Sequence, residues 1–109
     1  MLELLNRLCS YKSIADFTGD PACPYGEENG KALDFMLSTC KKFGFRTENL
    51  NNKVGFAEIG DGDSIIGVLV HLDVVPAGDG WHYEPFAATL DGDRIYGRGV
   101  IDDKGPAVA

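Results

Sequence analysis

The stretch Ser64-Ile65-Ile66-Gly67-Val68-Leu69-Val70 is the most apolar run of the chain, and it leads directly into His71-Leu72-Asp73. Its residues are apolar almost without interruption, which is typical of a strand covered on both faces and not of one with a solvent face. The run is far too short for a membrane span, which takes about 20 apolar residues. We therefore expect residues 64–70 to form the central strand of a sheet covered by helices.

The residues before this run predict two helices. Leucines at helical spacing predict an amphipathic helix over residues 1–12. A second helix is predicted over residues 26–43, because the acidic pair Glu27-Glu28 suits its first turn and the basic pair Lys41-Lys42 suits its last. Both helices have an apolar stripe that could cover a sheet.

Two hairpins and a short third helix complete the pattern. The hairpins are predicted from residues 45–50 with 54–59, and from residues 88–90 with 94–96. Asn51-Asn52 and Asp91-Gly92-Asp93 supply their turns, because these residue types tolerate tight hairpin geometry. Pro106 predicts the first turn of the third helix. We expect an α/β fold with three layers, α/β/α, around a mixed, mostly parallel sheet.

Composition narrows the classes of function. Seventeen acidic residues against ten basic ones give a net charge of −7, which disfavours nucleic acid as a partner. The N-terminus has no uninterrupted apolar core, so we expect neither a signal peptide nor a membrane partner. The three cysteines are odd in number and include no Cys-x-x-Cys pair, which favours the reducing cytoplasm over a disulfide framework.

The first group of residues that could bind a metal or take part in catalysis follows the apolar run. On a strand, His71 and Asp73 project to the same side, at the carboxyl end where ligands gather in open α/β sheets. A carboxylate beside an imidazole fixes the tautomer of the ring and makes it a better metal ligand. The alternative interpretation is a pH-sensitive surface pair at the end of a strand.

The second group is Asp102-Asp103, between a glycine-rich stretch and the third helix. Its alternative interpretation is helix capping by aspartate, with Asp103-Lys104 as a solvated ion pair. Taken together with His71, the carboxylate of Asp102 would make half of a metal site, because tetrahedral zinc takes about four ligands.

A longer pattern connects the two groups. It runs through His71-Leu72-Asp73-Val74-Val75-Pro76-Ala77-Gly78-Asp79-Gly80-Trp81, Pro85-Phe86, Arg94-Ile95-Tyr96-Gly97-Arg98-Gly99 and Asp102-Asp103-Lys104-Gly105-Pro106. This pattern resembles the dizinc metallo-exopeptidase family, which includes peptidase V, carnosinase and aminoacylase, and it is most similar to the peptidase V-like dipeptidases. The resemblance implies that His71 and Asp102 are metal ligands, with Asp102 bridging two zinc ions. It implies that Asp73 is the catalytic carboxylate that orients His71, and that Asp103 is no ligand.

The resemblance implies a hydrolase: a metallopeptidase that cleaves dipeptides through a water bridging two zinc ions. Manganese or cobalt would also suit histidine with carboxylates. One alternative is an N-acyl amino acid deacylase of the same family. Another is a noncatalytic remnant that acts at most as a binding module.

In that family the general-base glutamate, the remaining ligands and a lid domain follow the Asp-Asp-Lys-Gly motif. We therefore expect residues 1–109 to be the N-terminal portion of a catalytic domain, with its sheet incomplete. Such a portion would hold metal weakly or not at all and would be inactive. It would also expose a sheet edge, through which we expect it to self-associate.

Overall fold

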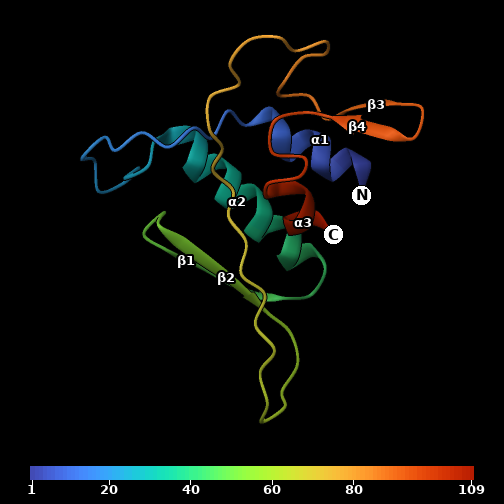
Figure 1. Ribbon diagram of the computed structural model, residues 1–109. Helices are drawn as coiled ribbons and strands as arrows, with labels where there is room; N and C mark the ends of the chain where they lie inside the picture. Colours follow the sequence, from blue (N-terminus) through green and yellow to red (C-terminus); the bar gives the residue numbers. More distant parts are fainter.

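The computed structural model describes all residues of the chain, 1–109. In chain order its elements are α1 (Leu2–Ser10), α2 (Glu27–Lys42), β1 (Arg46–Leu50), β2 (Val54–Glu58), β3 (Thr89–Asp91), β4 (Arg94–Tyr96) and α3 (Lys104–Val108). The strands form two separate antiparallel hairpins, β1 with β2 and β3 with β4 (Figure 1). The α/β class and each predicted helix and hairpin are therefore confirmed, with small shifts at their ends.

The first hairpin shows how its residues dictate its shape. Asn51 and Asn52 both adopt positive φ angles, 58° and 54°, as the tight turn between β1 and β2 requires. The hairpin packs against α2 through Gly55, where a Cβ would come within 2.8 Å of Leu37 Cδ1. Gly55 thus allows the strand to approach the helix closely.

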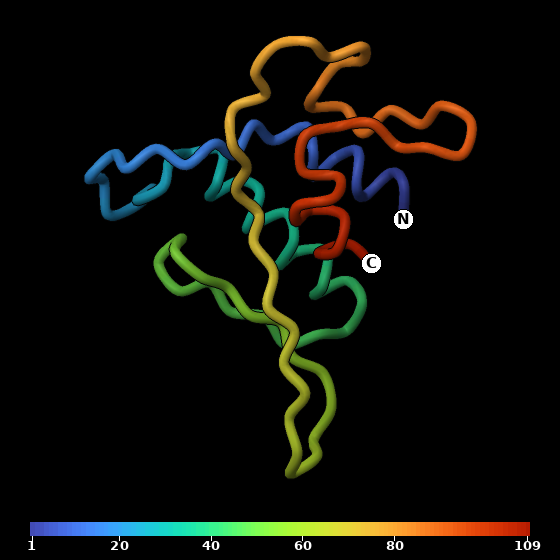
Figure 2. Tube along the Cα trace, in the orientation of Figure 1, coloured from blue at the N-terminus to red at the C-terminus, as the bar shows by residue number.

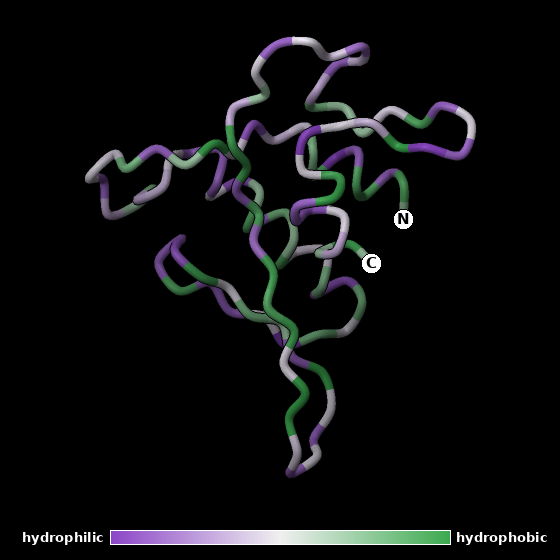
Figure 3. The backbone as a smooth tube through the Cα atoms, in the orientation of Figure 1, coloured by the Kyte–Doolittle hydropathy of each residue, from purple (hydrophilic) through white to green (hydrophobic).

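The prediction of a central strand at residues 64–70 is wrong for this chain. The stretch is extended but unpaired, and no backbone group in it is hydrogen-bonded to the rest of the protein (Figure 2). Ile66 and Leu69 are 94% and 96% exposed, and Figure 3 shows the apolar residues running along this open stretch. A strand is stabilised by its neighbours, and residues 1–109 place none beside it.

The extended segment is hydrogen-bonded to the rest of the protein only after the apolar run has ended. Val74 forms an isolated parallel bridge with Ile14, and its amide donates to the Ser13 carbonyl oxygen at 2.9 Å. This is the one parallel pairing of the chain. The predicted three-layer arrangement with a mostly parallel sheet is therefore not formed by residues 1–109.

The core is small and gathers around α1. Only 11 of 109 residues are buried, and the apolar ones are Leu5, Leu8, Cys9, Ala32, Val74 and Ala88. The helix α3 packs on α1, so both ends of the chain meet there (Figure 1). None of the helices has the length and apolar character that a membrane span needs. This core positions the segments that carry the candidate site.

Candidate metal site

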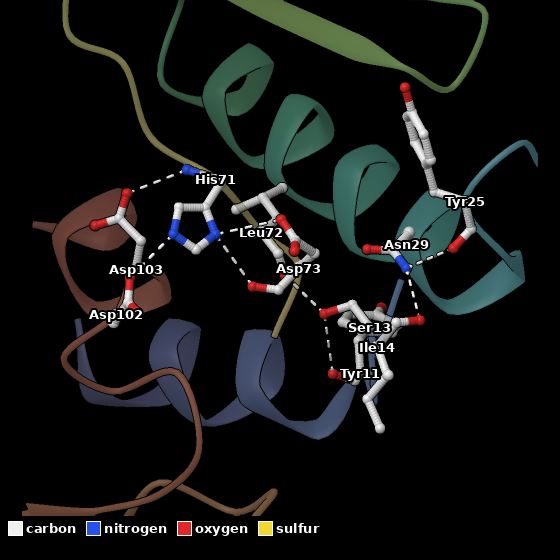
Figure 4. A network of polar contacts seen from close by, with 10 residues as sticks. All are labelled: Tyr11, Ser13, Ile14, Tyr25, Asn29, His71, Leu72, Asp73, Asp102 and Asp103. Atoms are coloured by element: carbon white, nitrogen blue, oxygen red, sulfur yellow. Dashed lines mark hydrogen bonds and ion pairs between the residues drawn. The ribbon is translucent and has the colours of Figure 1, made fainter. Parts of the chain in front are cut away.

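The imidazole of His71 lies at the centre of the candidate site (Figure 4). Its Nε2 is 3.0 Å from Asp102 Oδ1. Its Nδ1 is 3.3 Å from Asp73 Oδ1 and 3.2 Å from the Asp73 carbonyl oxygen. The structure thus brings together the three residues that the sequence singles out, although Asp102 is 31 positions from His71. Their roles as ligands and as a catalytic group stay predictions.

The environment of His71 favours a positive charge on the ring. Desolvation opposes the protonated form, but the hydrogen bond with Asp102 and the contacts with Asp73 outweigh it and raise the pKa of His71. The side chains remain accessible, with Asp102 84% exposed. Two carboxylates that favour a proton on an imidazole would also favour a cation beside it.

Asp103 also contributes, through a contact that the sequence does not signal. Its Oδ2 accepts a hydrogen bond from the backbone amide of His71 at 3.1 Å. Asp103 therefore links the two segments of the site through the backbone, although the family pattern assigns it no metal. The peptide bond between Asp102 and Asp103 is cis.

The turn that carries Asp102 is shaped by close backbone approaches. Gly99 has a φ of 89°, and a Cβ there would be 3.0 Å from Val74 Cγ1. A Cβ on Gly105 would overlap the carbonyl oxygen of Val100. These glycines let the turn fold back against the chain that follows His71.

Lys104 is not the solvated partner of Asp103 that the capping interpretation requires. Its side chain is fully buried, and its Nζ donates to the carbonyl oxygens of Leu8 at 3.1 Å and Tyr11 at 2.7 Å. Burial lowers the pKa of Lys104 to about 8. A sequence pattern shows only that a lysine follows the aspartates, so this role depends on the packing of α3 against α1.

A shallow hollow of about 260 Å³ adjoins Asp102 and is lined in part by Trp81 and Arg98. The Arg98 guanidinium lies over the Trp81 ring, 5.4 Å from its centroid, and donates to the Ala77 carbonyl oxygen at 3.2 Å. Arg98 makes no ion pair with a carboxylate. Asp102 is itself one of the residues that line the hollow.

The donor atoms present suit a metal ion in kind but are too few to hold one firmly. An imidazole nitrogen and a carboxylate oxygen are typical zinc ligands, and a tetrahedral site takes about four of them. No group of three or more His, Cys, Asp or Glu side chains in the chain is arranged to hold a metal. Residues 1–109 thus offer the pair His71 and Asp102.

Comparison with known proteins matches the sequence of this chain to peptidases. Residues 67–109 match the model described as peptidase family M20/M25/M40. The chain is 51% identical over 92 residues to "Putative dipeptidase YtjP" of Bacillus subtilis, covering 84% of this chain and 20% of that protein. It is 42% identical over 110 residues to a "Putative dipeptidase" of Staphylococcus epidermidis, covering 100% of this chain and 24% of that protein. The chain thus spans between a fifth and a quarter of the length of these curated relatives.

Proposed function

We propose that this chain is part of a metal-dependent dipeptidase, because residues 67–109 match the model of peptidase family M20/M25/M40 and the chain is similar to proteins named dipeptidases. The observation that carries the proposal is the convergence of His71, Asp73 and Asp102 at one exposed point. The names of the relatives support a dipeptide as the substrate class. The activity is proposed for the protein as a whole.

Each residue of the site has a distinct part in this proposal. His71 would bind one ion through Nε2, the nitrogen that lies 3.0 Å from Asp102. Asp73 would hold the opposite nitrogen and so fix the orientation of the ring. Asp102 is 84% exposed, and its carboxylate would bind metal in place of its present contact with His71 Nε2.

The proposed cofactor is a pair of zinc ions, with manganese or cobalt as substitutes. When bound, such ions supply Lewis acidity, which makes a nearby water a stronger acid and polarises the scissile carbonyl group. The protein's own contribution is to place the donors and to keep the imidazole oriented.

The proposal also accounts for the exposed apolar run. We infer that residues 64–70 form a strand in the three-layer sheet of the whole catalytic domain, of which residues 1–109 are the N-terminal portion. The nearly complete exposure of Ile66 and Leu69 supports this, because such residues are usually covered. With two donor side chains, residues 1–109 on their own are expected to be inactive.

The free thiols of Cys9, Cys23 and Cys40 favour a cytoplasmic protein.

The test uses the longest open reading frame that contains residues 1–109. The purified product is stripped with a chelator, reloaded with zinc, manganese or cobalt, and assayed on dipeptides, tripeptides and N-acetyl amino acids. We expect metal-dependent hydrolysis of dipeptides with a free amino group. Hydrolysis of N-acetyl amino acids alone would make the protein a deacylase, and no hydrolysis with any metal would overturn the proposal.

Variants of the same product test the residues. His71→Ala and Asp102→Ala should reduce dipeptide hydrolysis to background, and Asp73→Asn should reduce it about 10- to 100-fold. The matched control is His82→Ala, since His82 is exposed and its ring stands against the Tyr83 ring, 5.1 Å between centroids. Full activity in His71→Ala would exclude it as a ligand.

A further inference from the structure

We propose that Ser13 and Lys104 are positioning residues, which fasten the two halves of the candidate site to one segment at the end of α1. That segment, residues 8–14, is called the α1 anchor below. The halves are residues 71–73 and residues 102–103. This inference rests on the proposed function only for the roles of His71 and Asp102 as metal ligands. The attachment of the two halves to α1 is read directly from the hydrogen bonds of Ser13 and Lys104.

Ser13 fastens the first half. Its side chain is fully buried, and its Oγ donates to the Leu72 carbonyl oxygen at 2.6 Å (Figure 4). Its own carbonyl oxygen accepts from the Val74 amide at 2.9 Å. These two bonds hold the backbone at Leu72 and at Val74, the residues on either side of Asp73. The rotation of this extended segment, and thus the side to which His71 points, is therefore set by the anchor.

Lys104 fastens the second half. Its Nζ reaches the carbonyl oxygens of Leu8 and Tyr11, which lie at the end of α1 where helical partners run out. A cation is also favoured at this end of the helix dipole. The stem of Lys104 runs beneath Gly99, because a Cβ there would be 3.1 Å from Lys104 Cδ. The turn before α3, with Asp102 two residues away, is thereby fixed to the same anchor.

The contacts between the halves are too weak to set their relative position alone. His71, Asp73 and Asp102 are half or more exposed, and ion pairs in such surroundings contribute little. By contrast, the side chains of Ser13 and Lys104 are fully buried; the Lys104–Leu8 bond is buried and the Ser13–Leu72 bond is partly buried, and a buried polar group that loses its partner is costly. The site geometry therefore depends on two side chains that contact no candidate ligand side chain.

The test compares Ser13→Ala and Lys104→Met with the unaltered chain of residues 1–109, by amide hydrogen exchange and nuclear Overhauser effects. Methionine keeps the apolar stem of Lys104 and removes its donors. In Lys104→Met we expect the His71 amide, which is bonded to Asp103, to exchange about tenfold faster. The Val74 amide, which is bonded to the Ser13 carbonyl, should exchange at its original rate.

Ser13→Ala gives the complementary result. The His71 amide should again exchange faster, whereas the Gly105 amide, bonded to the Gly99 carbonyl at 3.2 Å, should keep its rate. In both variants the Overhauser effect between the His71 ring and the Asp102 side chain should weaken. Ser13→Ala decides the question if Lys104→Met does not fold.

Two substitutions of the same type serve as controls. Ser10→Ala removes an exposed hydroxyl that bonds only within α1, to the Arg7 carbonyl oxygen. Lys31→Met removes an exposed lysine that pairs with Glu27 and Glu28. Neither should change the His71 amide or the His71–Asp102 contact. The proposal is overturned if that contact survives in Ser13→Ala, or if all amides accelerate by a common factor, which would indicate loss of stability without loss of position.

Discussion

Residues 64–70 and residues 71–74 are consecutive parts of one extended stretch, but their surroundings are opposite. In the first part Leu69 is 96% exposed and no backbone group is paired. In the second part Val74 is 5% exposed and is bonded to the α1 anchor. The difference shows that apolar character alone does not bury a segment. Burial requires partners of the right shape, and for this stretch residues 1–109 supply them only at the end that carries His71.

The sharpest way to break the comparison is to add one methyl group to the exposed run and one to the first turn of α3, which packs against α1. Gly105→Ala should lower the free energy of unfolding by at least about 3 kcal/mol, because the new Cβ would overlap the Val100 carbonyl oxygen. Gly67→Ala should change it by less than about 0.5 kcal/mol, since nothing lies within 4 Å of that position. Urea unfolding followed by circular dichroism measures both. Equal effects would mean that the two regions are packed alike.

Removing apolar volume should reveal the same contrast. Leu8→Ala should cost about 3 kcal/mol, because Leu8 is fully buried in the core under the site. Leu69→Ala should cost less than about 0.5 kcal/mol, because that side chain is already in water. The same unfolding measurement applies. A large loss in Leu69→Ala would indicate that the apolar run is covered in solution.

The exposed run leads to a prediction about association. Its six residues from Ile65 to Val70 carry no charge and no proline, and their unpaired backbone can pair with a second copy of the chain. We expect residues 1–109 to self-associate, and Val68→Lys to shift the population toward monomer. Light scattering over a concentration series measures this. A control variant, Lys53→Glu in the β1–β2 turn, should leave association unchanged, and a monomeric unaltered chain would refute the prediction.

The smallest effect is expected for polar contacts that lie entirely on the surface. The hydrogen bond from Lys31, at 2.8 Å, lowers the pKa of Glu28. Because the folded-state pKa is the lower one, its stabilisation is present at neutral pH and is lost as the pH falls through that value. Glu28→Gln should therefore remove a small part of the acid dependence of the unfolding midpoint. An acid dependence identical to that of the unaltered chain would show that the pair contributes nothing.

Much of the local structure and the family could be predicted from the residues alone. Helical spacing predicts α1 and α2, and turn residues such as Asn51-Asn52 predict the hairpins, because these signals act over a few residues. The resemblance to a peptidase family is confirmed by the match of residues 67–109 to the model of peptidase family M20/M25/M40. The sequence also predicts that His71 and Asp73 share a side, since residues two apart on an extended chain do so.

Only the tertiary structure decided how the distant parts meet. The apolar run suggests a buried strand, but burial depends on neighbours that the pattern of the run itself cannot supply. The pairing of His71 with Asp102 and the reach of Lys104 to the carbonyl oxygens of α1 depend on the packing of α3 against α1. Local sequence patterns determined which residues could take part in catalysis or metal binding. Long-range packing determined the positions of these residues in space, because contacts between distant segments are set by the fold and not by neighbouring residues.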